Sequence, residues 1–273
     1  MIFGISQKQK YLLEHENILN GLLNKKELVL FLDYDGTLAP IAETPEKAVM
    51  TQEMKEVLIS LSKHPRCHNV VISGRMLSDL KQMINLPNIT YMGNHGYEIE
   101  ARHDLNFKGF ITLQYKEVLL QIKKDLINKL SSIRGVWIED KGIILTVHYR
   151  LATEGSGKLA KKVLMIECRD YLKNKQIGII EGKKVIEIRP PIKWDKGEAA
   201  LWILSKCQKE FGKDQIASIY VGDDYTDEDA FRMLNGIAMT VKVGFPKKSL
   251  ANYHLKNQPE VLDLLNRIMA LKS

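Results

Sequence analysis

The sequence predicts an α/β fold in which a mainly parallel sheet is interrupted by an inserted α+β unit. Two observations support this class. Short apolar runs typical of buried strands alternate with segments of helical periodicity in the first and last thirds of the chain. Between about Ala101 and Pro190 the order changes to helix, two strands, helix, two strands, in an antiparallel style. We therefore expect a core domain formed by residues 1–100 and 191–273, with an inserted domain at 101–190.

Composition is that of an ordinary globular protein. Of the 273 residues, 45% are hydrophobic and 27% are charged, which suits one large domain or two modest ones. No apolar run approaches the ~20 residues of a membrane span, and polar residues interrupt every apolar cluster near the N-terminus. We therefore expect a cytoplasmic protein that does not associate with a membrane.

The cysteines and the distribution of charge argue against cysteine-based sites and against a nucleic-acid partner. The three cysteines lie far apart without a CxxC pair, so neither a zinc knuckle nor a disulfide framework is indicated. The formal net charge of +7 would suit an anionic small molecule or a nucleic acid. The lysines are spread along predicted helices, without a dense basic run interleaved with aromatics. Solvated helix faces explain most of them, and we expect no nucleic-acid partner.

The first predicted strand carries a chemical signal at its end. Residues 28–32 are apolar, and Asp33 and Asp35 follow at the carboxyl end, where open α/β sheets bind ligands. Two carboxylates so close repel each other, so keeping both ionised calls for a divalent cation with oxygen ligands, above all Mg2+. A carboxylate there can also attack phosphorus. Gly36 permits a sharp turn, and Thr37 offers a hydroxyl and an N–H to an anion. Taken alone, the two acids fit an acidic surface turn about equally well.

A helix and a second buried strand come next. Thr51 is suited to cap a helix, and residues 70–72 form the strand. Ser73, Gly74 and Arg75 stand where this strand stops, just before another helix. A hydroxyl, helix N-terminal N–H groups and a guanidinium all favour an anion. Taken alone, a helix cap and a surface charge explain these residues better.

The next strand is short and ends in a polar turn. Residues 89–93 are mostly apolar, and Asn94 and His95 follow them. The two side chains could hold sugar hydroxyls. An ordinary hairpin turn that contains a histidine explains them as well and is favoured without other context.

The inserted unit offers polar candidates for substrate contact. Residues 113–133 have helical periodicity, and residues 136–150 alternate through a Lys141-Gly142 turn as a hairpin. A second helix at 157–172 and a second hairpin at 177–190 complete the unit. The candidates for substrate contact are Glu139, Lys141, His148 and Arg150. Each fits an outward-facing strand or turn residue at least as well.

Two signals mark the return to the core. Asp195 is suited to cap a helix, and Lys196 falls in its first turn, where a cation opposes the helix dipole. That cost suggests another role for Lys196, such as facing an anion. A strand at 219–221 then ends in Gly222, and five acids occupy the next seven positions. Such a concentration calls for a cation: Asp223, Asp224, Asp227, Glu228 and Asp229.

Both ends of the chain predict helices packed on the sheet. The last third closes with a strand at 236–244, a loop containing Tyr253, and a helix at 261–271 preceded by Pro259, a favourable first position. A lead-in helix at the N-terminus would place five apolar or aromatic residues on one face: Tyr11, Leu12, Ile18, Leu19 and Leu22.

Together these motifs carry a resemblance. DYDGT at 33–37, the strand-terminal Ser73, Lys196 and GDDYTDED at 222–229 resemble the four signature motifs of the haloacid dehalogenase superfamily of phosphohydrolases. FLDYDGTLAPI, VVISGR, YMGNHGYEIE, WIEDKG, VHYR, KWDKGEA and VGDDYTDEDAF resemble the trehalose-6-phosphate phosphatase family in order and spacing, from about Glu27 to the last helix. The resemblance implies a Rossmann-like parallel-sheet core of that superfamily with an α+β cap domain.

The resemblance also implies chemistry and residue roles. It implies hydrolysis of trehalose 6-phosphate through an aspartyl-phosphate, with Asp33 as nucleophile, Asp35 as acid and base, and Lys196 as a further catalytic residue. Mg2+ would be held by Asp33, Asp35, Asp223 and Asp224, with Asp227 an alternative to Asp224. Contacts to the substrate are implied for thirteen positions: Asp33, Asp35, Thr37, Ser73, Gly74, Arg75, Asn94, His95, Glu98, Glu139, Lys141, His148 and Arg150.

Three alternatives stay open at this point. The first is a phosphatase of another sugar phosphate, since the cap motifs are shorter than the core motifs. The second is a non-catalytic sugar-phosphate-binding regulatory module, of the kind fused to a synthase. The third is a phosphotransferase, because water and a sugar hydroxyl compete for the same intermediate. If the chain belongs to the trehalose-6-phosphate phosphatase family, we expect a monomer that binds a small sugar phosphate and neither nucleic acid nor membrane.

Overall fold

The computed structural model describes residues 10–23, 27–101, 112–245 and 248–272. They form two compact units. The core unit contains the described residues up to Ala101 and from Trp194 on, and the inserted unit contains residues 112–193. No helix in these ranges is both long and apolar enough to cross a membrane.

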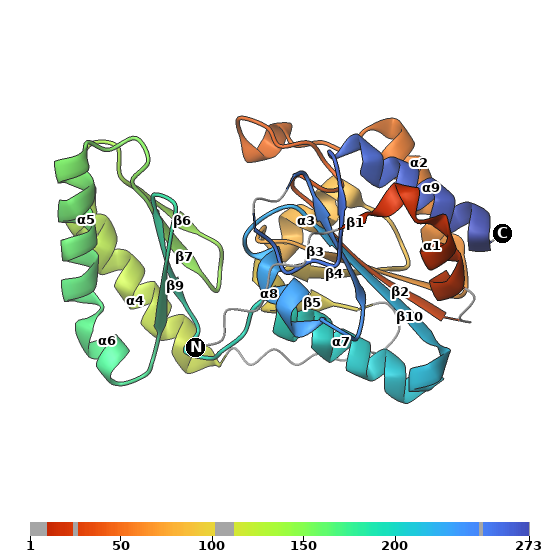
Figure 1. Cartoon of the computed structure of the whole chain (residues 1–273). Coiled ribbons are helices and arrows are strands. Elements are labelled where there is room, and N and C mark those ends of the chain that lie inside the picture. Colours follow the sequence, from red (N-terminus) through yellow and green to blue (C-terminus); the bar gives the residue numbers. More distant parts are fainter. Residues whose placement is uncertain (1–9, 24–26, 102–111, 246–247, 273) are drawn as a thin grey trace. The chain divides into compact units, whose positions relative to one another are not determined.

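The core unit is built on an eight-stranded sheet in the order β1-β12-β11-β10-β2-β3-β4-β5 (Figure 1). Every neighbouring pair is parallel except β4 and β5, which confirms the predicted α/β class. The strands are β1 (Lys10–Tyr11), β2 (Glu27–Asp33), β3 (Cys67–Ile72), β4 (Ile89–Gly93), β5 (Glu98–Glu100), β10 (Ile216–Gly222), β11 (Met239–Val243) and β12 (Tyr253–Leu255).

Helices cover both faces of this sheet. Leu28, Leu30 and Leu32 of β2 pack in one apolar cluster, and Val29 and Phe31 pack in another on the opposite face. The first cluster includes residues of α1 (Glu16–Leu23), α2 (Gln52–Lys63), α3 (Leu77–Ile84) and α9 (Pro259–Lys272). The second includes residues of α7 (Lys196–Phe211) and α8 (Asp227–Met233). A strand buried on both faces explains the continuous apolar run in β2.

The strand order fixes where a ligand can bind. From β2 the chain moves to β3 and β4 on one side, whereas β10, β11 and β12 lie on the other side. The order therefore reverses between β2 and β10, which pair in register from Glu27 opposite Ile216 to Leu32 opposite Val221. In open α/β sheets such a switch point leaves a crevice at the carboxyl ends of the two strands. The acids after β2 and after β10 both lie at that edge.

Several predicted helix starts are confirmed by their caps. Thr51 Oγ1 accepts a hydrogen bond from the Met54 N–H at 3.2 Å at the start of α2. The Asp195 carboxylate accepts from the N–H groups of Gly197 at 2.9 Å and Glu198 at 3.0 Å at the start of α7. Pro259 is the first residue of α9. These caps satisfy N–H groups that have no partner within the helix.

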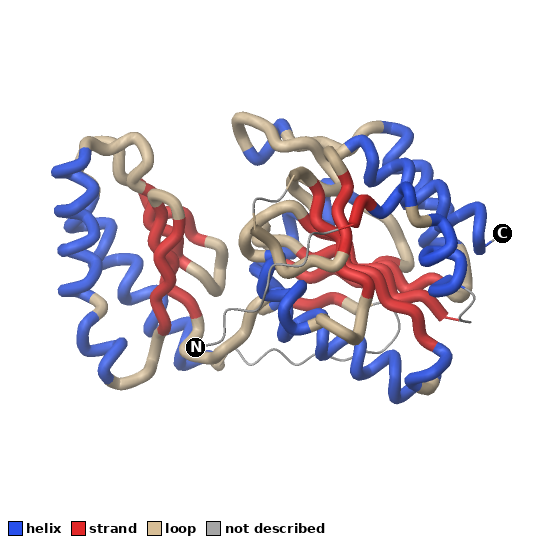
Figure 2. Tube along the Cα trace, in the orientation of Figure 1, coloured by secondary structure: helices blue, strands red, loops and turns tan. Residues whose placement is uncertain are grey.

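The inserted unit has the predicted order of elements. An antiparallel sheet, β6-β7-β9-β8, carries its helices on one face (Figure 2). The expected second helix is divided at Cys168, where the backbone N–H bonds back to both Leu164 and Ile166 and tightens the turn. The elements are α4 (Leu113–Leu130), β6 (Trp137–Asp140), β7 (Leu145–His148), α5 (Glu154–Glu167), α6 (Arg169–Lys173), β8 (Gly178–Gly182) and β9 (Val185–Arg189).

Two predictions about the edge of the core sheet are wrong. Tyr11 is not on the lead-in helix but in strand β1, and the helix itself covers only Glu16–Leu23. Tyr253, expected in a loop, begins strand β12, which pairs with β1 in parallel. Strands of two and three residues are too short to show periodicity. Contacts across the chain hold them, such as the hydrogen bond from the Tyr11 hydroxyl to Glu260 Oε1 at 3.0 Å.

Candidate active site

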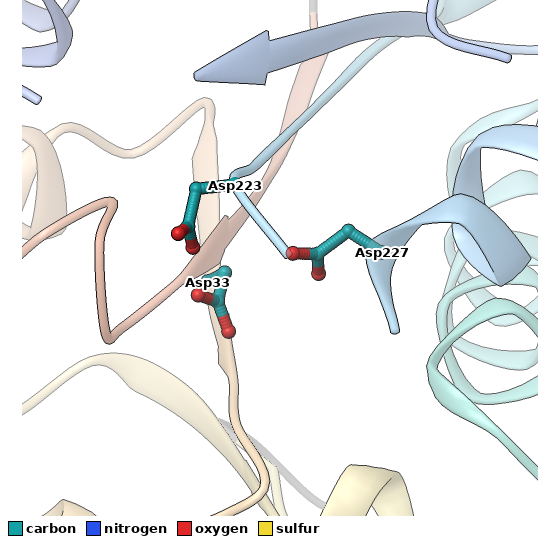
Figure 3. Close-up of side chains that lie close together, drawn as sticks. All are labelled: Asp33, Asp223 and Asp227. Atoms are coloured by element: carbon teal, nitrogen blue, oxygen red, sulfur yellow. The ribbon is translucent and has the colours of Figure 1, made fainter. Parts of the chain in front are cut away.

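Three carboxylates converge at the switch point. Asp33 is the last residue of β2, Asp223 follows β10, and Asp227 is the first residue of α8. One oxygen from each lies within 4.8 Å of the others, and Figure 3 shows the Asp223 carboxylate pointing toward Asp33. Gly36 has a φ of +80°, and a Cβ there would collide with the Asp223 carboxylate. The tight turn after β2 therefore requires glycine.

Lys196 links two of these acids. Its side chain is only 3% exposed, and its ammonium lies 2.6 Å from Asp33 Oδ1 and 2.9 Å from Asp227 Oδ1. Burial alone lowers the pKa of Lys196, but the carboxylates of Asp227 and Asp33 outweigh it and raise that pKa above its usual value. Lys196 is thus held as a cation, which explains its position in the first turn of α7. Asp227 also accepts from the Tyr220 hydroxyl at 2.9 Å and from the Asp224 N–H at 3.0 Å.

The Lys196 ammonium offsets only part of the charge of these three acids. Burial raises the pKa of Asp33 well above its ordinary value, Lys196 opposes the rise, and Asp227 and Asp223 add to it. Burial, followed by the carboxylates of Asp227 and Asp224, raises the pKa of Asp223 to about 6. Asp223 Oδ1 is buried and has no hydrogen-bond partner among the described residues. A divalent cation with oxygen ligands would relieve this repulsion and occupy that oxygen, so the residues fit Mg2+.

Asp35 has a different partner. Arg75 Nε lies 2.7 Å from Asp35 Oδ2 and Arg75 Nη2 lies 2.5 Å from Asp35 Oδ1, a two-bond pairing. Arg75 Nη2 also donates to the Pro45 carbonyl at 2.8 Å. The Arg75 guanidinium therefore holds Asp35 at the edge of the site. The sequence suggested that Arg75 binds an anion or braces the loop. It did not indicate that Arg75 pairs with Asp35, which lies 40 residues away in the sequence.

The other predicted residues of the core unit lie on neighbouring loops. Thr37 and Ser73 are buried at 0% and 1% exposure. Ser73 Oγ accepts from the Arg75 N–H at 3.1 Å, and the Ser73 carbonyl accepts from the His95 N–H at 2.8 Å. A Cβ on Gly74 would come 2.7 Å from His95 Cε1, so any larger residue there would force the His95 ring to move. The loops after β3 and β4 thus form one interlocked unit.

Asn94 and Glu98 complete that unit. Asn94 Nδ2 donates to Glu98 Oε2 at 2.7 Å, and the same oxygen accepts from the Leu77 N–H at 3.3 Å. The Asn94 N–H donates to the Arg75 carbonyl at 2.7 Å. Glu98 thus ties β5 to the start of α3 and to the turn after β4.

Asp224 is placed apart from the three-acid cluster. It is exposed, and its Oδ1 accepts from the N–H of the adjacent Tyr225 at 2.6 Å. Asp227 occupies the buried position instead. Asp227 accepts hydrogen bonds from both Lys196 and Tyr220. The acidic run predicted a charged segment here, but nothing in the sequence indicated these two partners.

The polar candidates of the inserted unit form a local group. Glu139 Oε2 lies 2.8 Å from His148 Nε2 and 3.8 Å from Lys141 Nζ. The hydrogen bond from His148 lowers the pKa of Glu139, which stays ionised. The Trp137 ring, 43% exposed, stacks on His148 at 4.6 Å and was not identified from the sequence. Arg150 is exposed in the turn after β7.

The fold is that of haloacid dehalogenase-like hydrolases. A haloacid dehalogenase-like hydrolase from Bacteroides thetaiotaomicron shares the fold, with a TM-score of 0.58 and 16% identity over 89% of this chain and 100% of that chain. Residues 31–259 match the family model described as trehalose-phosphatase. The chain belongs to the trehalose-phosphatase family and is a phosphatase, as its motifs predicted.

Individual relatives agree with this family. The chain is 34% identical to the probable trehalose-phosphate phosphatase D of Arabidopsis thaliana, over 90% of this chain and 68% of that protein. It is 26% identical to the C-terminal domain of the trehalose-6-phosphate phosphatase of C. albicans. That comparison covers 97% of this chain and 99% of the other, with a TM-score of 0.74.

Proposed function

We propose that this phosphatase hydrolyses trehalose 6-phosphate to trehalose and phosphate with Mg2+ as its metal. One observation carries the proposal. Lys196 neutralises Asp227 and contacts Asp33, while Asp223 keeps a buried oxygen without a partner beside them. The site therefore combines a nucleophile, a fixed cation and a ligand for a divalent metal. We infer the substrate from the relatives described above, which are named as trehalose-phosphate phosphatases.

Asp33 and Asp223 are the residues that would hold the metal through their carboxylates. The resemblance to the family implies two further ligands, the backbone carbonyl of Asp35 and the side chain of Asp224. Mg2+ supplies positive charge that polarises the phosphoryl group and offsets its repulsion from Asp33 when it is bound. Oxygen donors alone suit Mg2+ better than a softer metal.

The chain's own residues carry the two steps. An oxygen of Asp33 forms a bond to phosphorus while the bond from phosphorus to the sugar oxygen breaks, and Asp35 gives that oxygen a proton. Asp35 then takes a proton from water, whose oxygen bonds to phosphorus as the Asp33–phosphorus bond breaks. Arg75 donates to both oxygens of Asp35 in this structure, so one of these two hydrogen bonds has to break when the Asp35 oxygen that accepts it carries the proton.

Phosphoryl oxygens would be bound by fixed donors. Lys196 is a buried cation within reach of Asp33, and Ser73 and Thr37 are buried hydroxyl residues on adjacent loops. Donors that are already oriented stabilise charge as it shifts during transfer. The N–H groups around Gly74 would add to this set, as the sequence predicted.

Sugar selection is proposed for two groups of residues. Asn94, His95 and Glu98 form one group in the core unit. Glu139, Lys141, His148 and Arg150, with Trp137 added by the structure, form the other in the inserted unit. Charged side chains offer strong hydrogen bonds to hydroxyls, and an exposed aromatic face suits the apolar side of a sugar ring. On this proposal the inserted unit is a substrate-recognition domain.

The test is phosphate release from trehalose 6-phosphate, sucrose 6-phosphate and glucose 6-phosphate, with Mg2+ or with EDTA. We expect a strong preference for the trehalose ester and its loss in EDTA. Asp33→Asn, which keeps the side-chain shape, should abolish release while the melting temperature does not fall. Substantial turnover by this variant would refute the nucleophile assignment. Broad weak activity would refute the sugar, and binding without release would favour a non-catalytic module.

A further inference from the structure

One cation beside the acidic loop has no role in the chemistry proposed above. Lys242 lies near the end of β11, in register with Gly222 of β10, and its side chain is only 13% exposed. Its ammonium donates to the backbone carbonyl of Asp223 and, at 3.2 Å, to that of Asp224. Glu228 Oε1 lies 4.0 Å away. Lys242 therefore binds the backbone of the loop that contains the predicted metal ligands.

We propose that Lys242 is a positioning residue for the metal site. By binding the carbonyls of Asp223 and Asp224 it fixes this stretch of backbone, and thereby holds the Asp223 carboxylate near Asp33. The inference rests on the proposed function, which places Mg2+ at these carboxylates. It adds a residue that reaches the metal only through Asp223.

The distribution of ion pairs supports this role. Asp227 pairs with Lys196, and Asp229 pairs with Arg232 at 2.6 Å. Within the described ranges no ion pair reaches the carboxylate of Asp223 or Asp224. Lys242 brings positive charge to this loop through its carbonyls. It offsets the negative charge and leaves the carboxylate oxygens of Asp223 open to a metal.

The opposite side of the crevice has a comparable restraint. Gln258 Nε2 donates to the carbonyls of Thr37 at 3.1 Å and Leu38 at 3.2 Å, in the turn that follows the nucleophile. Both loops are thus held through backbone carbonyls by side chains from the last quarter of the chain. The turn after β2 is held by the neutral amide of Gln258, whereas the acid-rich loop after β10 is held by the cation of Lys242. This difference indicates that the charge of Lys242 is important.

Lys242→Met tests the proposal, because it keeps much of the side-chain length and removes the charge. Mg2+ binding is measured by titration calorimetry without substrate and by the Mg2+-induced rise in melting temperature. Lys242→Arg retains the charge and serves as the rescue variant. Lys209→Met is the control: it makes the same charge change at an exposed position in the last turn of α7, roughly 20 Å along the helix from Lys196.

We expect Lys242→Met to weaken Mg2+ binding about tenfold or more, since a hydrogen bond from a charged group is lost. Lys242→Arg should stay within about threefold of the parent, and Lys209→Met should not differ from it. Unchanged or tighter Mg2+ binding by Lys242→Met would overturn the proposal, as would equal losses in both methionine variants. A parent protein that binds no Mg2+ would instead refute the proposed function.

Discussion

Replacing Lys196 with methionine should destabilise the protein and inactivate it for related reasons. The Lys196 side chain is 3% exposed, and its ammonium lies 2.6 Å from Asp33 Oδ1 and 2.9 Å from Asp227 Oδ1. Its removal leaves two buried carboxylates without a cation, near a third at Asp223. Breaking a buried ion pair by removing one partner costs about 3–5 kcal/mol. For a core unit of this size that corresponds to a fall in melting temperature of roughly 6–20 °C.

The pH dependence separates this explanation from a packing defect. Without Lys196, the pKa of Asp33 rises further, because the ammonium is the main group that lowers it in the parent. A folded-state pKa above the unfolded value means that the folded protein holds a proton that the unfolded chain has released. Stability then falls as the pH rises from the unfolded to the folded pKa. The destabilisation in Lys196→Met should therefore be larger at pH 8 than at pH 5.

Thermal unfolding in EDTA at both pH values measures the effect. Adding Asp227→Asn to Lys196→Met removes one unpaired charge, so most of the lost stability should return. Phosphate release should stay about 10²–10³-fold below the parent in both variants, because the fixed cation is still absent. A fall of less than about 2 °C, or an equal fall at both pH values, would show that the ion pairs do not stabilise the site.

Three further predictions follow from the same contacts. Asp35→Asn weakens the pair with Arg75 and removes the proton donor and acceptor, so turnover should stall; an unchanged rate with trehalose 6-phosphate would contradict its role. Burial and neighbouring carboxylates raise the pKa of Asp223 to about 6, and a proton there competes with Mg2+, so Mg2+ affinity in calorimetry should rise at least about tenfold per pH unit up to pH 6; a flat profile would exclude Asp223 as a ligand. Glu139→Gln should raise the KM for trehalose 6-phosphate roughly tenfold or more without changing the melting temperature or the rate on a simple aryl phosphate; an unchanged KM would remove Glu139 from sugar recognition.

The sequence was sufficient to predict the features that depend on local pattern. The apolar run before Asp33 identified a buried strand, and the end of a strand in an open α/β sheet is where ligands bind. The same reasoning placed Ser73 and Asp223 at strand ends. Lys196 gave a weaker local signal, because a lysine in the first turn of a helix opposes the dipole. That conflict is resolved by the two carboxylates around it.

Contacts between distant segments were not predictable in this way. Arg75 pairs with Asp35 across 40 residues, and Lys242 reaches the Asp223 carbonyl across 19 residues. Neither arginine nor lysine indicates its partner through spacing or periodicity. The short edge strands β1 and β12 could not be predicted for the same reason, because they pair with each other and lie near opposite ends of the sequence.

Local sequence pattern and contacts between distant segments determine different features of the site. Local pattern places each acid at the carboxyl edge of the sheet, and the strand order brings Asp33 and Asp223 to one switch point because β2 and β10 are neighbours. Proximity alone would leave two buried carboxylates repelling each other. Lys196 contacts two acidic segments, and Arg75 and Lys242 contact one each. Each of these basic residues comes from an element other than those it contacts. Substitution of these basic residues should therefore alter metal binding and catalysis even where every acid is kept.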